Sequence, residues 1–144
     1  MTKVVINRCY GGFGLSKEAY IRYGEIKGMK VWIEDDKKFP SFGIFHAWIV
    51  PPEERPVNKE EEFYTMSMEE RKVYNEAWSS SCIYCHDIAR DDPALVQTVE
   101  ELGENKASGG FAELKVVEIP DDVEFDIAEY DGIEWVAEKH RTWS

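Results

Sequence analysis

The sequence contains no apolar run close to the roughly 20 residues that a membrane-spanning helix needs. No charged-then-apolar segment typical of a secretion signal opens the chain, which starts Met1-Thr2-Lys3 and runs directly into a β-like stretch. Basic residues are also scarce, with 17 Lys and Arg against 29 Asp and Glu and a formal net charge of −12. They form no stripe, so we expect a cytoplasmic protein that binds neither duplex nucleic acid nor a membrane surface.

Cysteine is rare, and the three present are Cys9, Cys82 and Cys85. Thiols of a cytoplasmic protein stay reduced. The run from Cys82 to His86 matches the CxxCH pattern of haem attachment, but attachment requires an export route that the chain does not indicate. On a short strand over 81–87, Cys82 and Cys85 point to opposite faces, which disfavours shared zinc ligation. We therefore expect free cysteines, no metal and no cofactor.

Apolar residues are plentiful, at 43% of the chain, and five of them are tryptophan. A chain of 144 residues with this composition buries roughly two-thirds of its unfolded surface, so we expect one domain over 1–144. Periodicity predicts an α+β fold, a mainly antiparallel sheet with about three helices and a C-terminal β-hairpin. The predicted strands are 3–9, 30–35, 42–50, 112–119, 123–130 and 133–139, and the predicted helices begin after Ser16, Ser67 and Asp92. Residues 104–110 are expected to be a loop.

The C-terminal hairpin has the strongest local signal. Asp131-Gly132 is typical of a two-residue turn between antiparallel strands. We expect Phe125 and Ile127 to share a face with Ile133 and Trp135, while Glu134 faces water.

A glycine-rich turn, Tyr10-Gly-Gly-Phe-Gly14, lies between the first strand and the first helix. Glycines let a backbone approach a ligand closely, and a helix start offers free N–H groups to an anion. We therefore take Gly11, Gly12, Gly14 and Ser16 as candidate ligand contacts. The turn lacks the lysine of a phosphate-binding Walker loop. A tight turn that only tucks neighbouring side chains into the core explains the same residues.

Two arginines and a terminal aromatic complete the candidate site. Arg90 precedes a helix start, where it can bind a ligand or pair with Asp91, Asp92 or a carboxylate of the sheet. Arg141 offers a cation near the C-terminus, and Trp143 a stacking wall. Arg141 can equally lie on the polar face of a last strand, and Trp143 can equally anchor the end of the chain.

Three blocks of the sequence, VVINRCYGGFGLS, HDIARDDPALVQTVEELG and VEIPDDVEFDIAEYDGIEWVAEKHRTW, resemble a family of small uncharacterised phage and prophage proteins. The resemblance covers about 1–26 and 84–144, and it implies that 36–80 is a variable insertion. It implies a phage accessory protein acting on host machinery, and it supplies no catalytic residue. The glycine turn, Arg90 and Arg141 all lie in the matched blocks, so we expect them to converge on one pocket.

These observations predict a non-enzymatic accessory protein that binds a small anionic, nucleotide-like ligand or a host protein. One alternative is a nucleotide-directed enzyme that uses Cys9 or His140. A second alternative is an acidic decoy that blocks a basic host surface, and its capture of a partner would weaken steeply with salt. The sequence indicates no oligomeric state.

Overall fold

The computed structural model describes residues 1–36 and 43–139. Over these residues it is an α+β fold with five α-helices and six strands that pair antiparallel, which confirms the predicted class. The elements are β1 Thr2–Asn7, α1 Lys17–Ile26, β2 Trp32–Asp35, β3 Phe45–Trp48, the 3-10 helix η2 Pro52–Glu54, α2 Glu60–Phe63, α3 Met68–Ser81, the 3-10 helix η3 Cys85–Asp87, α4 Pro93–Leu102, α5 Glu104–Ala107, β4 Leu114–Ile119, β5 Phe125–Tyr130 and β6 Ile133–Glu138. No described helix is long and apolar enough to cross a membrane.

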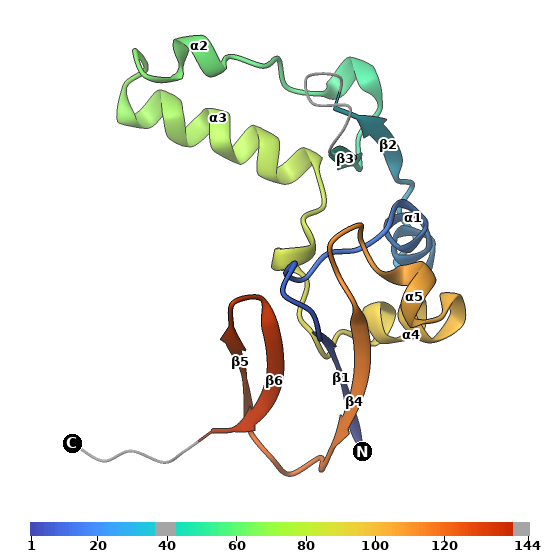
Figure 1. Cartoon of the computed structure of the whole chain (residues 1–144). Helices are drawn as coiled ribbons and strands as arrows, with labels where there is room; N and C mark the ends of the chain where they lie inside the picture. Colours follow the sequence, from blue (N-terminus) through green and yellow to red (C-terminus); the bar gives the residue numbers. More distant parts are fainter. Residues whose placement is uncertain (37–42, 140–144) are drawn as a thin grey trace, which may run out of the picture.

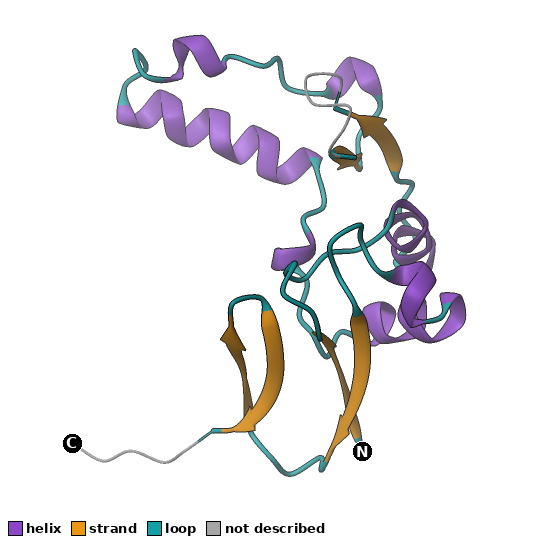
Figure 2. Ribbon diagram, viewed as in Figure 1, coloured by secondary structure: helices purple, strands orange, loops and turns teal. Residues whose placement is uncertain are grey.

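The strands form three separate two-stranded ladders, β1–β4, β2–β3 and β5–β6. Strand β1, at the start of the chain, pairs with β4, which comes late in the sequence, and Val5 lies opposite Val116. Helix α4 packs on β1 and α1, and α5 packs on β4. Figures 1 and 2 show these helices on one side of β1–β4 and the β5–β6 hairpin on the other. The core lies under the helices, where Val5, Leu95 and Val99 have no exposed surface.

The helix starts agree with the predicted capping residues. Ser16 accepts a hydrogen bond from the Ala19 backbone N–H. Asp92 accepts one from the Ala94 N–H, with Pro93 at the first helical position, and Gly103 ends the helix. Each side chain satisfies a backbone donor that the first turn leaves unpaired. The predicted loop 104–110 is wrong in part, because α5 occupies its first four residues.

The β5–β6 hairpin confirms the predicted turn and corrects the predicted faces. Asp131 and Gly132 have φ of 52° and 94°, as a two-residue turn of this kind requires. The turn therefore pairs Tyr130 with Ile133 and Ile127 with Val136. Glu134 falls on the same face as Ile127 and is buried, whereas Trp135 is 43% exposed. The expectation that Glu134 faces water was wrong. It placed Ile133 and Trp135 on the face of Ile127, whereas the observed pairing places Glu134 there.

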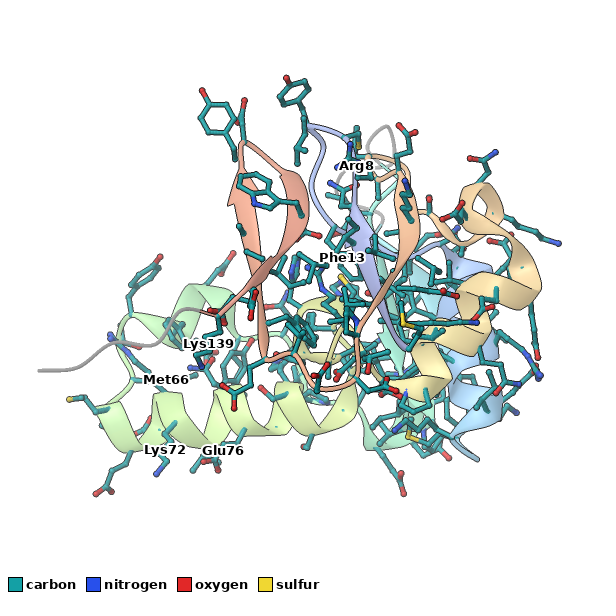
Figure 3. The ribbon with its side chains drawn as sticks, turned by 90° about the horizontal axis from the view of Figure 1, so that it is seen from below. Arg8, Phe13, Met66, Lys72, Glu76 and Lys139 are labelled. Atoms are coloured by element: carbon teal, nitrogen blue, oxygen red, sulfur yellow. The ribbon has the colours of Figure 1, made fainter. Side chains whose placement is uncertain are left out.

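The described residues 32–36 and 43–81 form an arm that carries β2, β3, η2, α2 and α3 away from the rest of the molecule, which we call the body (Figure 1). The predicted insertion 36–80 falls inside the arm. Backbone hydrogen bonds from Ile49 to Ser81 and from Ile83 to Ala47 tie its base together. Helix α3 buries only Ser81 of its 14 residues. Figure 3 shows Lys72 and Glu76 of α3 pointing away from the body.

Candidate functional site

The glycine turn is held by backbone contact with the loop at 109–111. An added Cβ at Gly11 would lie 1.7 Å from the Phe111 carbonyl oxygen, so only glycine fits there. The Gly109 N–H donates to the Gly14 carbonyl across the same contact. These contacts give Gly11 a structural role, while Gly12 and Gly14 face open space. The predicted ligand contacts at the turn remain predictions.

The Ser16 hydroxyl is used twice within the chain. Its oxygen accepts from the Ala19 N–H at 3.1 Å, and the hydroxyl donates to the Lys106 carbonyl at 2.7 Å. Ser16 therefore fixes the start of α1 and ties it to α5.

Arg90 stacks on Phe13 of the glycine turn, and its guanidinium is already engaged. Arg90 does not line the cavity beside Gly11, Gly12 and Gly14. It forms two hydrogen bonds to the Glu134 carboxylate at 2.5 and 2.8 Å and a third to the Val5 carbonyl. Its Cζ lies 3.5 Å from the centre of the Phe13 ring. Of the partners predicted for Arg90, the carboxylate on the sheet is the one observed. Figure 3 shows Phe13 in the middle of the molecule.

The same network closes around Asn7, which has no exposed surface. Its backbone N–H donates to Glu134, and its amide nitrogen donates to the carbonyls of Cys9 and Gly132. Hydrogen bonds within the chain join the side chains of Asn7, Arg90 and Glu134, so the cluster locks the hairpin against β1. Arg141 and Trp143 lie outside the described residues, as does His140, and the predicted convergence with Arg141 stays a prediction.

The cysteines are free, and the predicted strand over 81–87 is wrong. Only Cys82 pairs with Trp48 as an isolated bridge, and the chain then turns into the 3-10 helix η3. Burial raises the pKa of the Cys82 thiol to about 11. The Cys9 thiol donates to the Asn7 side chain and to the Phe111 carbonyl. Among the described residues no group of three His, Cys, Asp or Glu side chains is placed to hold a metal.

A groove on the arm has a volume of about 1420 Å³. We call it the aromatic groove. Strands β2 and β3 form one wall, and the segment from η2 to α3 forms the other. Its lining residues are Glu34, Asp35, Asp36, His46, Trp48, Pro52, Arg55, Pro56, Asn58, Phe63, Tyr64, Tyr74, Asn75, Trp78 and Tyr84.

Aromatic rings pack in a continuous row along the aromatic groove. The centres of the Trp48 and Trp78 rings are 5.1 Å apart, and His46 lies within 6.2 Å of both. Tyr74 continues the row at 6.3 Å from Trp78, and Phe63 lies 5.9 Å beyond Tyr74. Rings at such distances attract one another through offset and edge contacts. The row contributes to holding α3 to the arm, together with hydrogen bonds from Arg71 to the Phe63 and Tyr64 carbonyls.

Arg55 shows what the aromatic groove attracts. Its guanidinium lies over the Trp48 ring, with Cζ 4.9 Å from the ring centre. Nη1 donates to the Glu34 carboxylate at 3.1 Å, and the side chain is only 14% exposed. A cation over an indole face with a carboxylate alongside is a favourable arrangement. The chain thus fills part of its own groove with a cation.

The rim of the aromatic groove is acidic. Glu34, Asp35 and Asp36 line it against the single arginine. Asp35 also pairs with Lys17 of the body at 2.6 Å. The segment 51–63 that forms one wall contains five glutamates against Arg55 and Lys59. The groove therefore presents a negative field to any ligand that approaches it.

Two donors in the aromatic groove have no partner. The indole N–H groups of Trp48 and Trp78 are buried, and no acceptor for either lies among the described residues. A buried donor without an acceptor costs about 1–3 kcal/mol. An acceptor that reaches these groups when the rings part would recover that energy.

The sequence contained one signal for this groove. The alternation of His46 and Trp48 puts both on one face of a strand, and the four-residue spacing of Tyr74 and Trp78 puts both on one face of a helix. The same spacings are typical of residues that only pack a strand or a helix onto its neighbours. That the two faces meet, with carboxylates at the rim, depends on contacts distant in the sequence.

No family model, curated protein or solved structure matches the chain.

Proposed function

We propose that this protein is a non-enzymatic binding protein whose arm captures a basic segment of a partner protein in the aromatic groove. The observation that carries the proposal is the position of Arg55, a guanidinium over Trp48 and beside Glu34. The resemblance to phage accessory proteins favours a host protein as the partner.

A basic peptide supplies each group for which the aromatic groove has a complement. Its Lys or Arg side chains can lie over the faces of rings that line the groove and reach solvent, such as that of Tyr64, where each cation–π contact contributes about 0.5–2 kcal/mol. Its charge is drawn by the rim and by the net charge of −12.

A small anionic ligand has less support. Among the described residues that line it, the aromatic groove offers an anion one arginine, Arg55, which already pairs with Glu34. At the glycine turn, the guanidinium of Arg90 is neutralised by Glu134. The proposal therefore combines the host-protein and acidic-decoy interpretations of the sequence. It does not include a nucleotide-like ligand.

Binding of synthetic peptides tests the proposal. A fluorescent peptide of alternating Arg and Gly is titrated with the protein, and a peptide with Glu in place of Arg is the control. We expect the Arg peptide to bind and the Glu peptide not to bind. The affinity should fall as salt rises, because exposed charges are screened beyond about 8 Å at physiological ionic strength.

Charge variants locate the binding surface. The double variant Glu34→Gln/Asp35→Asn removes two rim carboxylates, and Glu118→Gln/Asp122→Asn removes two exposed carboxylates of the body. Both change the net charge from −12 to −10. We expect the rim variant to weaken binding about tenfold, or about 1.4 kcal/mol, and the body variant to change it little. Equal losses would show non-specific attraction and would contradict the proposal.

Ring variants test the stacking component. Trp78→Leu removes a ring of the groove, and Trp135→Leu removes a ring of the β5–β6 hairpin that is 43% exposed. We expect Trp78→Leu to weaken peptide binding about 5- to 30-fold, equivalent to about 1–2 kcal/mol. Trp135→Leu should leave it unchanged. Circular dichroism and unfolding curves establish that both variants are folded.

A further inference from the structure

A second concave site lies where the arm meets the body. It has a volume of about 540 Å³, which is within the range of small-molecule pockets. The glycine loops at 11–14 and 109–111 form one side, and strand β3 with the segment 82–86 forms the other. We call it the glycine cleft. Strand β3 separates it from the aromatic groove, and His46 and Tyr84 border both.

Two glycines of this cleft are not required by the fold. Neither Gly14 nor Gly110 has a positive φ, and a Cβ added to either would meet nothing within 4 Å. Gly11, in contrast, has no room for a side chain. Because Gly14 and Gly110 line the cleft and have no side chains, they leave its space open.

The glycine cleft is lined without formal charge. None of the described residues that line it is Asp, Glu, Lys or Arg, although such residues make up 32% of the chain. An anion in the cleft would find no lysine or arginine among them, only the imidazoles of His46 and His86, and a cation would find no carboxylate. Burying either without a partner is costly, so the lining selects an uncharged ligand.

Aromatic side chains set the shape of that ligand. Phe45 and Tyr20 meet edge to face with ring centres 5.6 Å apart, and Phe13 meets His86 at 6.3 Å. All four line the glycine cleft. The Tyr20 hydroxyl accepts from the Cys85 N–H, which fixes the ring. Aromatic rings that line a cavity favour a flat ligand, which they contact by stacking or by edge contacts.

We propose that the glycine cleft binds a small, uncharged, flat heteroaromatic molecule. The backbone of the glycine loops approaches the ligand closely where Gly14 and Gly110 lack side chains. The proposal does not depend on capture of a basic segment by the arm.

Matched probes test the charge requirement. Indole and adenine are the neutral probes, and indole-3-acetate and adenosine 5′-monophosphate are their charged counterparts. Binding is measured by protein-observed NMR at millimolar probe concentrations. We expect a neutral probe to shift resonances of the loops at 11–14 and 109–111, and its charged counterpart to bind at least about tenfold more weakly.

Filling variants test the place. Gly14→Leu and Gly110→Leu each put a side chain into the open space, and Ser79→Leu adds the same side chain to the exposed surface of α3. We expect the two cleft variants to lose probe binding at least about tenfold and Ser79→Leu to retain it. Two positions keep the test decisive if one variant does not fold.

The proposal is overturned if neither neutral probe binds the wild-type protein, or if the charged probes bind as well as the neutral ones. It is also overturned if a folded cleft variant binds as the wild type does. The Arg peptide is titrated into the same variants, so a failure of the cleft is distinguished from a failure of the aromatic groove.

Discussion

The ion pair between Arg90 and Glu134 gives the sharpest prediction about stability. Glu134→Gln removes the negative charge and replaces one carboxylate oxygen with an amide nitrogen. The remaining oxygen can still accept from the Asn7 N–H and from Arg90 Nη1. The new NH₂ then faces Arg90 Nη2, which now donates at 2.8 Å. The variant thus loses one charged hydrogen bond and places two hydrogen-bond donors, the new NH₂ and Arg90 Nη2, against each other. It also leaves the Arg90 guanidinium buried without its counter-charge.

Breaking a buried pair by neutralising one partner costs about 3–5 kcal/mol. The Arg90 side chain is 15% exposed, so water reaches part of it, and we expect a loss near the lower end, about 3 kcal/mol. Urea unfolding followed by circular dichroism measures the change as a lower midpoint at constant slope. Glu138→Gln, on the exposed part of the same strand, is the control and should change stability by less than about 0.5 kcal/mol.

A double variant separates the buried charge from the lost contact. Arg90→Met with Glu134→Gln removes both charges and keeps an oxygen for the Asn7 N–H. We expect it to be more stable than Glu134→Gln alone by about 1–2 kcal/mol, because no uncompensated charge remains. A loss below about 1 kcal/mol for Glu134→Gln would refute the reasoning, since the pair would then behave like one on the surface.

Three further predictions concern the cap, the glycine turn and the thiols. Asp92→Ala should cost about 1 kcal/mol at neutral pH by unfolding measurements. Burial alone would raise the pKa of Asp92, but hydrogen bonds and a nearby lysine hold it below 3.8, so the difference from the wild type should shrink as the pH falls below that value. Gly11→Ala should destabilise the protein by at least about 2 kcal/mol and Gly14→Ala by less than about 0.5 kcal/mol, because only the first lacks room for a methyl group. Iodoacetamide should label the half-buried Cys9 before Cys82, whose pKa burial raises to about 11, and mass spectrometry of the peptides gives the order.

Local chemistry made much of the fold predictable. Ser16 and Asp92 mark helix starts because each side chain accepts a hydrogen bond from a backbone N–H of the first turn. Gly103 marks the end of α4. Asp131-Gly132 predicted the hairpin because both residues accept the positive φ that the two-residue turn requires. The short helix α5 was missed, since its four residues carry no apolar periodicity.

The error at Glu134 shows where local reasoning fails. In a two-residue turn the residues on either side pair directly, so even-numbered positions of β6 share a face with odd-numbered positions of β5. Hydrophobicity suggested the opposite, because Ile133 and Trp135 are apolar and Glu134 is charged. The strand follows the pairing, and the buried carboxylate is tolerated because Arg90 and Asn7 meet it.

The candidate site depended still more on distant contacts. The sequence placed Arg90 near the glycine turn and named a sheet carboxylate as one of its partners. It did not show that both Nη atoms of the Arg90 guanidinium donate to this carboxylate. The aromatic groove is assembled from strand β3, helix α3 and the segment between them, so its rings and carboxylates meet only in the folded arm.

The measurement that tests the central claim most directly is the affinity of the Arg peptide for the wild-type protein, the rim variant Glu34→Gln/Asp35→Asn and the body variant Glu118→Gln/Asp122→Asn. We predict binding to the wild type and the body variant that weakens with salt, and about tenfold weaker binding to the rim variant. Absence of binding to the wild type, or equal affinity for both variants, would contradict the assignment of the aromatic groove as a site for a basic partner.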